Sequence, residues 1–164
     1  MDPGGRLGGE DPYRELVYQS EGEAMPSGGR KFTRFTQVND FIDSVIVSPW
    51  WESMFPDAPI EVTVMRRSRG ATFSAATVDV AGEAGAIWIR DGSWDLVTVL
   101  HELAHVAAER DDPTGPHGSA FIDALGELWR HYLGFHAFGA LQSALEAHGV
   151  PLRRERRPPT SDTV

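Results

Sequence analysis

Apolar and polar side chains alternate with the period of a helix in the stretch that follows Ser93. The apolar members all fall on one side of a helical wheel: Leu96, Val99, Leu100, Leu103, Val106 and Ala107. His101 and His105 lie on the opposite side, because residues four apart differ by only about 40° around the axis. The pattern predicts a helix with Ser93 as its N-cap and residues 111–113 at its end, with its dry face toward a core and its histidine face toward a cleft.

Shorter patterns on either side of this helix supply the rest of the scaffold. Alternating β-branched and apolar residues precede it, and helical spacing dominates after it. The expected elements are a helix at 40–47, strands at 60–65, 71–80 (one or two) and 85–90, and helices at 121–133 and 137–148. Together they predict an α+β fold in which a small, mostly antiparallel sheet packs on the histidine helix, with further helices toward the C-terminus.

The length and composition of the chain indicate one domain. A chain of 164 residues with 41% hydrophobic content can bury a sizeable core, and we place that domain at 13–151. We expect residues 1–12 and the Arg/Pro-rich residues 152–164 to be flexible tails. No apolar run approaches the ~20 residues needed to cross a membrane, and the pattern of a signal peptide is missing, so we expect a cytoplasmic protein.

The net charge of the chain argues against nonspecific binding to nucleic acid. The formal net charge is −9, and attraction to phosphate needs clustered positive charge. Two basic clusters depart from this balance, at 66–69 and at 153–157. We interpret both as solvated segments, and the alternative is that they anchor an acidic partner or nucleic acid.

The histidine helix carries the pattern H-E-x-x-H, formed by His101, Glu102 and His105, and His117 follows twelve residues later. Two imidazoles one helical turn apart can share one metal ion at about 2 Å, whereas Glu102 lies about 100° away around the axis, beside the metal. A carboxylate in that position can take a proton from a water that zinc activates. The sequence therefore predicts one Zn²⁺ ion held by His101, His105 and His117, with Glu102 as the catalytic base.

The third ligand of this site has competitors. Asp111 stands where an extended pattern of some zinc peptidases places its third ligand, but that pattern requires glycine at the position of Ala108. Glu109 and Glu127 are further alternatives, because many zinc hydrolases use a downstream glutamate. We favour His117, and one of these carboxylates could replace or supplement it.

The run HELAHVAAERDDPTGPHGSAF, from His101 to Phe121, resembles the core of SprT-like zinc metalloproteases, in which H-E-x-x-H is followed by a loop and H-G-x-x-F. The layout of residues 12–150, including the early run Val17-Tyr18-Gln19-Ser20-Glu21, also resembles that of small metallohydrolases of actinobacteria and their phages. The resemblance implies a compact zincin-type fold with His101, His105 and His117 on zinc and Glu102 as the base. SprT-like proteases often carry a cysteine-based zinc ribbon, and this chain has no cysteine, so their DNA-linked role is not carried over.

We expect the substrate to bind along the strand at 85–90, because a sheet edge beside the cleft can pair with an extended peptide. The candidate contacts there are Ile87, Trp88 and Ile89. His131 and Tyr132 are candidates for polarising a substrate carbonyl. The predicted function is hydrolysis of peptide bonds by a zinc-dependent metallopeptidase. The alternatives are a zinc-binding interaction domain with little turnover and a hydrolase of a non-peptide amide.

Overall fold

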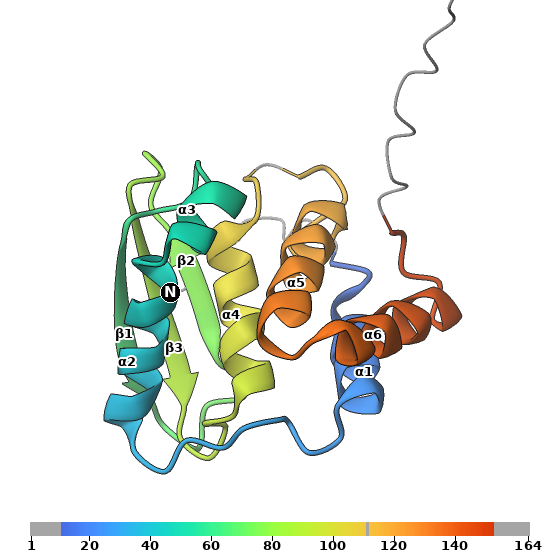
Figure 1. Ribbon diagram of the computed structural model, residues 1–164, viewed down its shortest axis with the longest axis horizontal. Helices are drawn as coiled ribbons and strands as arrows, with labels where there is room; N and C mark the ends of the chain where they lie inside the picture. The colour runs from blue at the N-terminus through green and yellow to red at the C-terminus, as the bar shows by residue number, and fades with distance from the viewer. Residues whose placement is uncertain (1–10, 111, 153–164) are drawn as a thin grey trace, which may run out of the picture.

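The computed structural model describes residues 11–110 and 112–152. This part of the chain forms an α+β fold, as expected, with helices around a small sheet (Figure 1). In chain order the elements are α1 (Arg14–Ala24), α2 (Phe35–Ile46), α3 (Pro49–Met54), β1 (Glu61–Arg67), β2 (Ala75–Val78), β3 (Ala84–Arg90), α4 (Leu96–Ala107), α5 (Ser119–Tyr132) and α6 (Phe135–Ala147).

The sheet is mixed rather than mostly antiparallel, and β3 is its central strand. β1 pairs with β3 in parallel from Glu61↔Ala84 to Arg67↔Arg90, and β2 pairs with the other side of β3 in antiparallel orientation. The prediction that strand 85–90 lies at the sheet edge is therefore wrong. Whether a strand is central depends on partners elsewhere in the chain, which its own residue pattern does not reveal.

α4 lies between the sheet and α5 (Figure 1). It packs against β2 and β3 on one side and against α5 on the other, while α1 lies against α6 and α2 against β1. The apolar stripe of α4 is at the centre of the core, where Val99, Leu100 and Leu103 are fully buried. The other face of α4 carries His101 and His105 toward α1 and the turn that precedes α5.

α4 begins after Asp95, two residues later than expected. The carboxylate of Asp95 accepts hydrogen bonds from the backbone N–H of Thr98 at 2.9 Å and from its hydroxyl at 3.2 Å, as an N-cap does. A carboxylate is favoured here because its negative charge also faces the positive end of the helix dipole. Ser93 instead accepts a hydrogen bond from Arg90. The predicted N-cap is thus wrong, but the face that carries the histidines is unchanged.

The other expected elements are present with shifted ends. α2 begins earlier than the helix expected at 40–47, and only one short strand, β2, forms within 71–80. β1, β3, α5 and α6 lie where strands and helices were expected. Gly134 separates the last two helices with a φ of +92°, a left-handed conformation that glycine adopts without strain.

The ends of the chain lie partly outside the described residues. Residues 1–10 and 153–164, with most of both expected tails and the second basic cluster, are not described. Asp11 and Pro12 are described, and Asp11 contacts His117, so two residues of the expected N-terminal tail belong to the described structure. Within the described ranges, no helix combines the length and apolar character needed to span a bilayer.

Candidate metal centre

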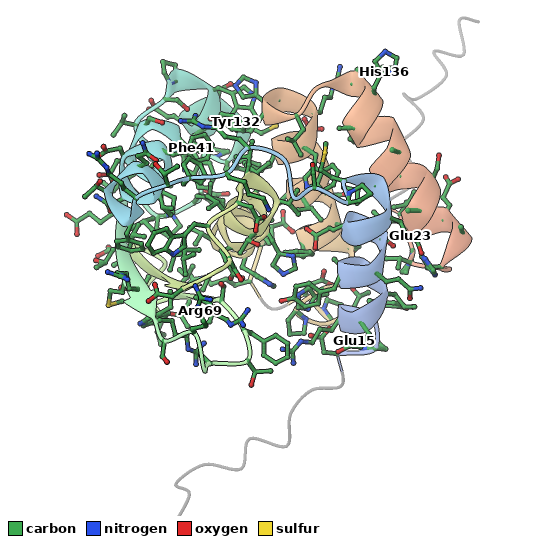
Figure 2. The ribbon with its side chains drawn as sticks, turned by 90° about the horizontal axis from the view of Figure 1, so that it is seen from below. Glu15, Glu23, Phe41, Arg69, Tyr132 and His136 are labelled. Carbon is green, nitrogen blue, oxygen red and sulfur yellow. The ribbon has the colours of Figure 1, made fainter. Side chains whose placement is uncertain are left out.

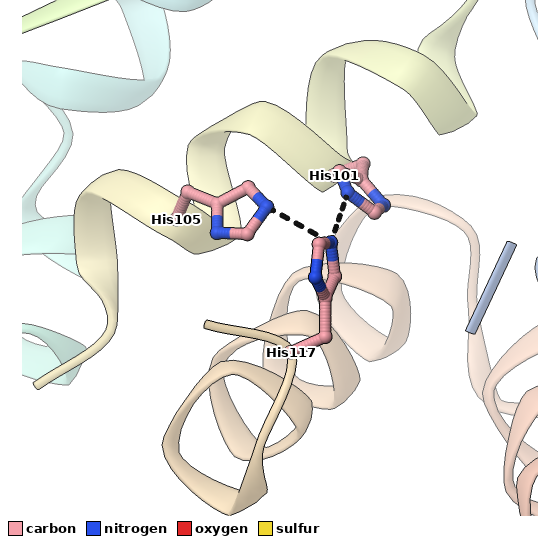
Figure 3. A group of neighbouring side chains, drawn as sticks. All are labelled: His101, His105 and His117. Atoms are coloured by element: carbon pink, nitrogen blue, oxygen red, sulfur yellow. Dashed lines mark hydrogen bonds between the residues drawn. The ribbon is translucent and has the colours of Figure 1, made fainter. Parts of the chain in front are cut away.

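Three imidazoles converge between α4 and the start of α5 (Figure 3). His101 and His105 project from one face of α4, and His117 comes from the turn just before α5. The Nε2 atom of His117 lies 3.1 Å from Nε2 of His101 and 3.2 Å from Nε2 of His105. The ligand atoms of the three residues all lie within 4.8 Å of one another. The structure thus brings together the three histidines that the sequence singled out.

The donor set and spacing of this cluster fit a zinc ion. The Nδ1 atom of His101 donates to Oε2 of Glu21 at 2.9 Å, and the Nδ1 atom of His117 donates to Oδ2 of Asp11 at 2.7 Å. A neutral imidazole that donates through Nδ1 carries a lone pair on Nε2, so lone pairs face one another in the cluster unless a cation or a proton lies between them. Two nitrogen ligands of a tetrahedral zinc ion, each 2.0–2.1 Å from the metal, are roughly 3.3–3.4 Å apart. The observed spacings are close to this value.

The protonation of the cluster follows from its burial. Burial, together with the neighbouring imidazoles, lowers the pKa of His105 to about 2, so this ring is neutral. Burial also lowers the pKa of His117, although its hydrogen bond to Asp11 opposes the shift. Burial acts in the same direction on His101, but the adjacent Glu21 carboxylate outweighs it, and the pKa of His101 is raised. The shifts therefore favour the neutral forms of His105 and His117, which offer a lone pair to a metal ion.

Glu102 lies beside the cluster in the position predicted for a base. Its side chain is buried, and its Oε2 atom has no hydrogen-bond partner among the described residues. Burial raises the pKa of Glu102 to about 7, with the positive charge of His101 opposing the rise and the negative charge of Glu21 adding to it. Glu102 lines a cavity of about 360 Å³ together with His101 and Tyr18. A carboxyl group with a pKa near neutrality can accept and return a proton at physiological pH.

The N-terminal segment supplies three groups to which the sequence patterns assigned no role. Besides Glu21 and Asp11, Tyr18 of α1 stacks on His101, with ring centroids 4.6 Å apart and planes inclined by 12°. Burial, then the nearby carboxylates, raise the pKa of Tyr18 to about 12, so its hydroxyl keeps its proton. Tyr18 and Glu21 stand three residues apart and so share one helix face, the one local signal that they act together.

The structure places the competing ligands elsewhere. Glu109 is exposed, and Glu127 lines a separate cavity between α5 and α6. Neither belongs to the group of converging ligand atoms. Asp111 lies outside the described residues. Among the candidates for the third ligand that lie in the described residues, His117 is the one next to His101 and His105.

The expected substrate contacts on β3 are not at the cleft edge. Ile87 and Ile89 are fully buried core residues, and Trp88 is half-buried between Met65 on β1 and Ala75 on β2. The basis of these assignments is wrong, because β3 has a partner strand on each side within the described part of the chain and offers no edge to a peptide there. The strand beside the metal centre is β2, whose residues line a cavity of about 920 Å³ together with His105 and Phe121.

His131 and Tyr132 also lie away from the metal centre. They end α5, about 20 Å along the helix axis from its first residue, which follows the His117 turn. His131 stacks on Trp50 with ring centroids 4.1 Å apart, and Tyr132 packs edge-on against Phe41 and Trp50 (Figure 2). Both side chains belong to an aromatic cluster with α2 and α3, so the proposal that they polarise a substrate is not supported.

Glu21 and Asp11 yield a first prediction. Replacing either by its amide, Glu21→Gln or Asp11→Asn, is expected to weaken zinc binding by about 10–100-fold, because a carboxylate that fixes a ligating imidazole raises its basicity and holds its ring. Competition with a chromophoric zinc chelator measures the change. Glu23→Gln is the matched control, because Glu23 lies on the same helix but contacts His148 at 2.9 Å. Equal zinc affinities for Glu21→Gln and Glu23→Gln would remove Glu21 from the centre.

Comparison of the chain with protein-family models, with curated proteins and with solved structures gave no match. The resemblance to SprT-like proteases therefore stays a prediction that rests on the two histidine motifs. The function has to be argued from the geometry of the centre itself.

Proposed function

We propose that the protein is a zinc-dependent metallohydrolase, and in particular a metallopeptidase in which Glu102 is the general base. One observation carries the proposal: the Nε2 atoms of His101, His105 and His117 converge at the spacing of zinc ligands, beside the buried carboxylate of Glu102. A buried histidine without a metal can be satisfied by ordinary hydrogen bonds. Core packing alone does not require three imidazoles to be directed at one point.

The residues around the centre have separate roles in this reaction. Zinc, when bound, supplies Lewis-acid activation of a water molecule and of a substrate carbonyl. Glu102 takes the proton of the attacking water on its unpartnered oxygen and passes it to the leaving amine nitrogen. Glu21 and Asp11 hold the rings of His101 and His117 in orientation through their Nδ1 atoms.

Among the described residues β2 has no strand partner on its outer side, and this edge favours an extended peptide as the substrate. The N–H of Asp79 donates to the carbonyl of Ala84 at 2.9 Å, so by the alternation of antiparallel pairs Ala76 and Val78 turn their N–H and C=O groups away from β3. Both residues line the cavity that contains His105. A peptide laid along this edge would form main-chain hydrogen bonds with β2 while it crosses the metal centre.

The arrangement favours an enzyme over a zinc-stabilised interaction domain. Structural zinc sites usually close all four positions with protein ligands, whereas the cluster found among the described residues has three. A purely structural site also has no use for a buried carboxyl such as that of Glu102 beside an open cavity. Hydrolysis of a non-peptide amide would use the same groups. The outward main-chain groups of β2, which can pair with an extended chain, favour a peptide as the substrate.

The test is metal analysis combined with a broad activity assay. The purified protein is expected to hold about one zinc ion per chain and to cleave members of a denatured-protein or peptide library. EDTA is expected to remove both metal and activity, and added Zn²⁺ to restore both. Zinc-loaded protein without turnover on any member would support the interaction domain instead. Cleavage of small amides alone would support the non-peptide hydrolase.

A further inference from the structure

A group of basic side chains surrounds the end of the sheet at which β1 and β3 terminate. We call this group the basic surface, and its members are Arg30, Lys31, Arg66, Arg67, Arg69 and Arg90. The pairing of Arg67 with Arg90 across the sheet and of Lys31 with Asp95 brings the three chain segments together. Figure 2 shows Arg69 on this side of the molecule. The 66–69 cluster, interpreted from sequence as a solvated segment, is thus part of a larger surface.

Most of these cations have no charged partner. Within residues 11–110 and 112–152, Arg66 is the one member of the basic surface that forms an ion pair, with Asp91 at 3.0 Å. Arg67 donates to the carbonyl of Phe73 at 3.1 Å, and Arg90 donates to the carbonyl of Arg69 at 3.0 Å. These bonds to neutral oxygens orient the guanidinium groups without neutralising them. The basic surface therefore keeps a local positive charge on a chain whose net charge is −9.

The basic surface continues into the catalytic cavity. A second cavity of about 390 Å³, lined by Lys31, Arg66 and Arg69, shares Lys31 and Asp95 with the cavity that contains Glu102. Arg90 lines the catalytic cavity itself. The common wall of the two hollows thus carries one cation, Lys31, and one carboxylate, Asp95, with Arg66 and Arg69 on the side away from Glu102.

The catalytic cavity contains two carboxylates besides Glu102. Glu21 accepts the hydrogen bond of His101, and Asp95 caps α4 through Thr98. Lys31 and Arg90 have no such ionic partner among the described residues and face the same space. The hydrogen bonds of Glu21 and Asp95 orient the two carboxylates without neutralising them, so the catalytic cavity holds charges of both signs, and the excess of cations lies on the basic surface beside it.

We propose that the basic surface binds an acidic segment of the substrate beside the catalytic cavity, so that the enzyme prefers peptides with aspartate or glutamate side chains near the scissile bond. This inference rests on the proposed function. A carboxylate that approaches over the basic surface meets Arg69 and then Lys31, which lies where the surface adjoins the catalytic cavity. A long nucleic acid fits less well, because its phosphates would extend beyond this patch onto a chain that is acidic as a whole.

Direct binding tests the inference with the zinc-loaded full chain. The probes are a fluorescent peptide of alternating Glu and Ala, its Gln and Ala counterpart, and a single-stranded oligonucleotide. The Glu peptide is expected to bind about tenfold more tightly than the Gln peptide at low salt, since several modest charge pairs together give this factor. The difference is expected to shrink as salt is added. Equal binding of both peptides, or tighter binding of the oligonucleotide, would overturn the inference.

Charge reversal locates the binding. Lys31→Glu and Arg69→Glu, made separately in case one disturbs folding, are each expected to weaken the Glu peptide by about tenfold. Arg130→Glu is the matched control, because Arg130 is exposed on α5, which lies on the other side of α4 from the sheet (Figure 1). An equal loss in the control would assign the effect to overall charge and overturn the inference.

Cleavage of the two peptides separates this inference from the proposed function. Hydrolysis of both at equal kcat/KM refutes the acidic preference and leaves the metallopeptidase standing. Selective binding of the Glu peptide without hydrolysis of any library peptide refutes the metallopeptidase and leaves an acid-binding surface. Preferred cleavage of the Glu peptide, reduced in Arg69→Glu, supports both.

Discussion

Replacing Glu102 by glutamine is expected to lower the rate of peptide hydrolysis by about 10²–10⁴-fold while zinc stays bound. Glutamine has the shape of glutamate but its amide does not accept the proton of the attacking water. Glu102 is not part of the converging ligand group, so its loss leaves the three imidazoles in place. Zinc content and kcat/KM on a library peptide, measured on the same preparation, give the result.

Glu127→Gln is the control for this variant. Glu127 undergoes the same chemical change but lines a cavity between α5 and α6, so its variant is expected to keep the parent activity and zinc. A Glu102→Gln protein that carries zinc and hydrolyses peptide as fast as the parent would refute the role of Glu102. Loss of zinc in Glu127→Gln would indicate instead that Glu127 is a zinc ligand.

Removing the imidazole of His117 is expected to weaken zinc binding by at least about 100-fold and to abolish hydrolysis. The binding free energy of a structural zinc site is about 10–16 kcal/mol over four ligands, so each ligand contributes several kcal/mol. His117 also contacts both of the other imidazoles. Without it, the cluster has only two ligands, His101 and His105. Equilibrium competition with a zinc chelator measures the His117→Ala variant, and circular dichroism verifies its fold.

His136→Ala is the matched control, because His136 is exposed on α6 (Figure 2). It is expected to bind zinc with the parent affinity. Parent affinity in His117→Ala would mean that a carboxylate completes the site, and Glu109→Gln in that background would identify one candidate.

The face of α4 that carries the metal centre could be predicted from sequence. The apolar stripe and the spacing of His101 and His105 are properties of one continuous helix, whose period places each side chain without reference to the rest of the protein. The position of His117 was also predictable in outline, because a short turn rich in Pro and Gly limits how far the chain can travel before α5 begins.

The edge of the sheet could not be predicted in this way. Strand 85–90 has the buried alternation of a sheet strand, but nothing in it reveals that β1 and β2 take both of its sides. The substrate contacts assigned to Ile87, Trp88 and Ile89 failed for that reason. The α+β class, in contrast, follows from the types and order of elements and was confirmed.

By itself, the sequence determined the helix of the candidate metal centre: its buried apolar face, its two imidazoles and the carboxylate beside them, because 3.6 residues per turn fix these relations locally. Only the tertiary structure decided what surrounds that helix. Glu21 meets His101 across 80 positions and Asp11 meets His117 across 106. The basic surface likewise joins segments that are distant in the chain. Contacts of this kind depend on how whole elements pack against one another, and that packing leaves no periodic pattern in the sequence from which it could be predicted.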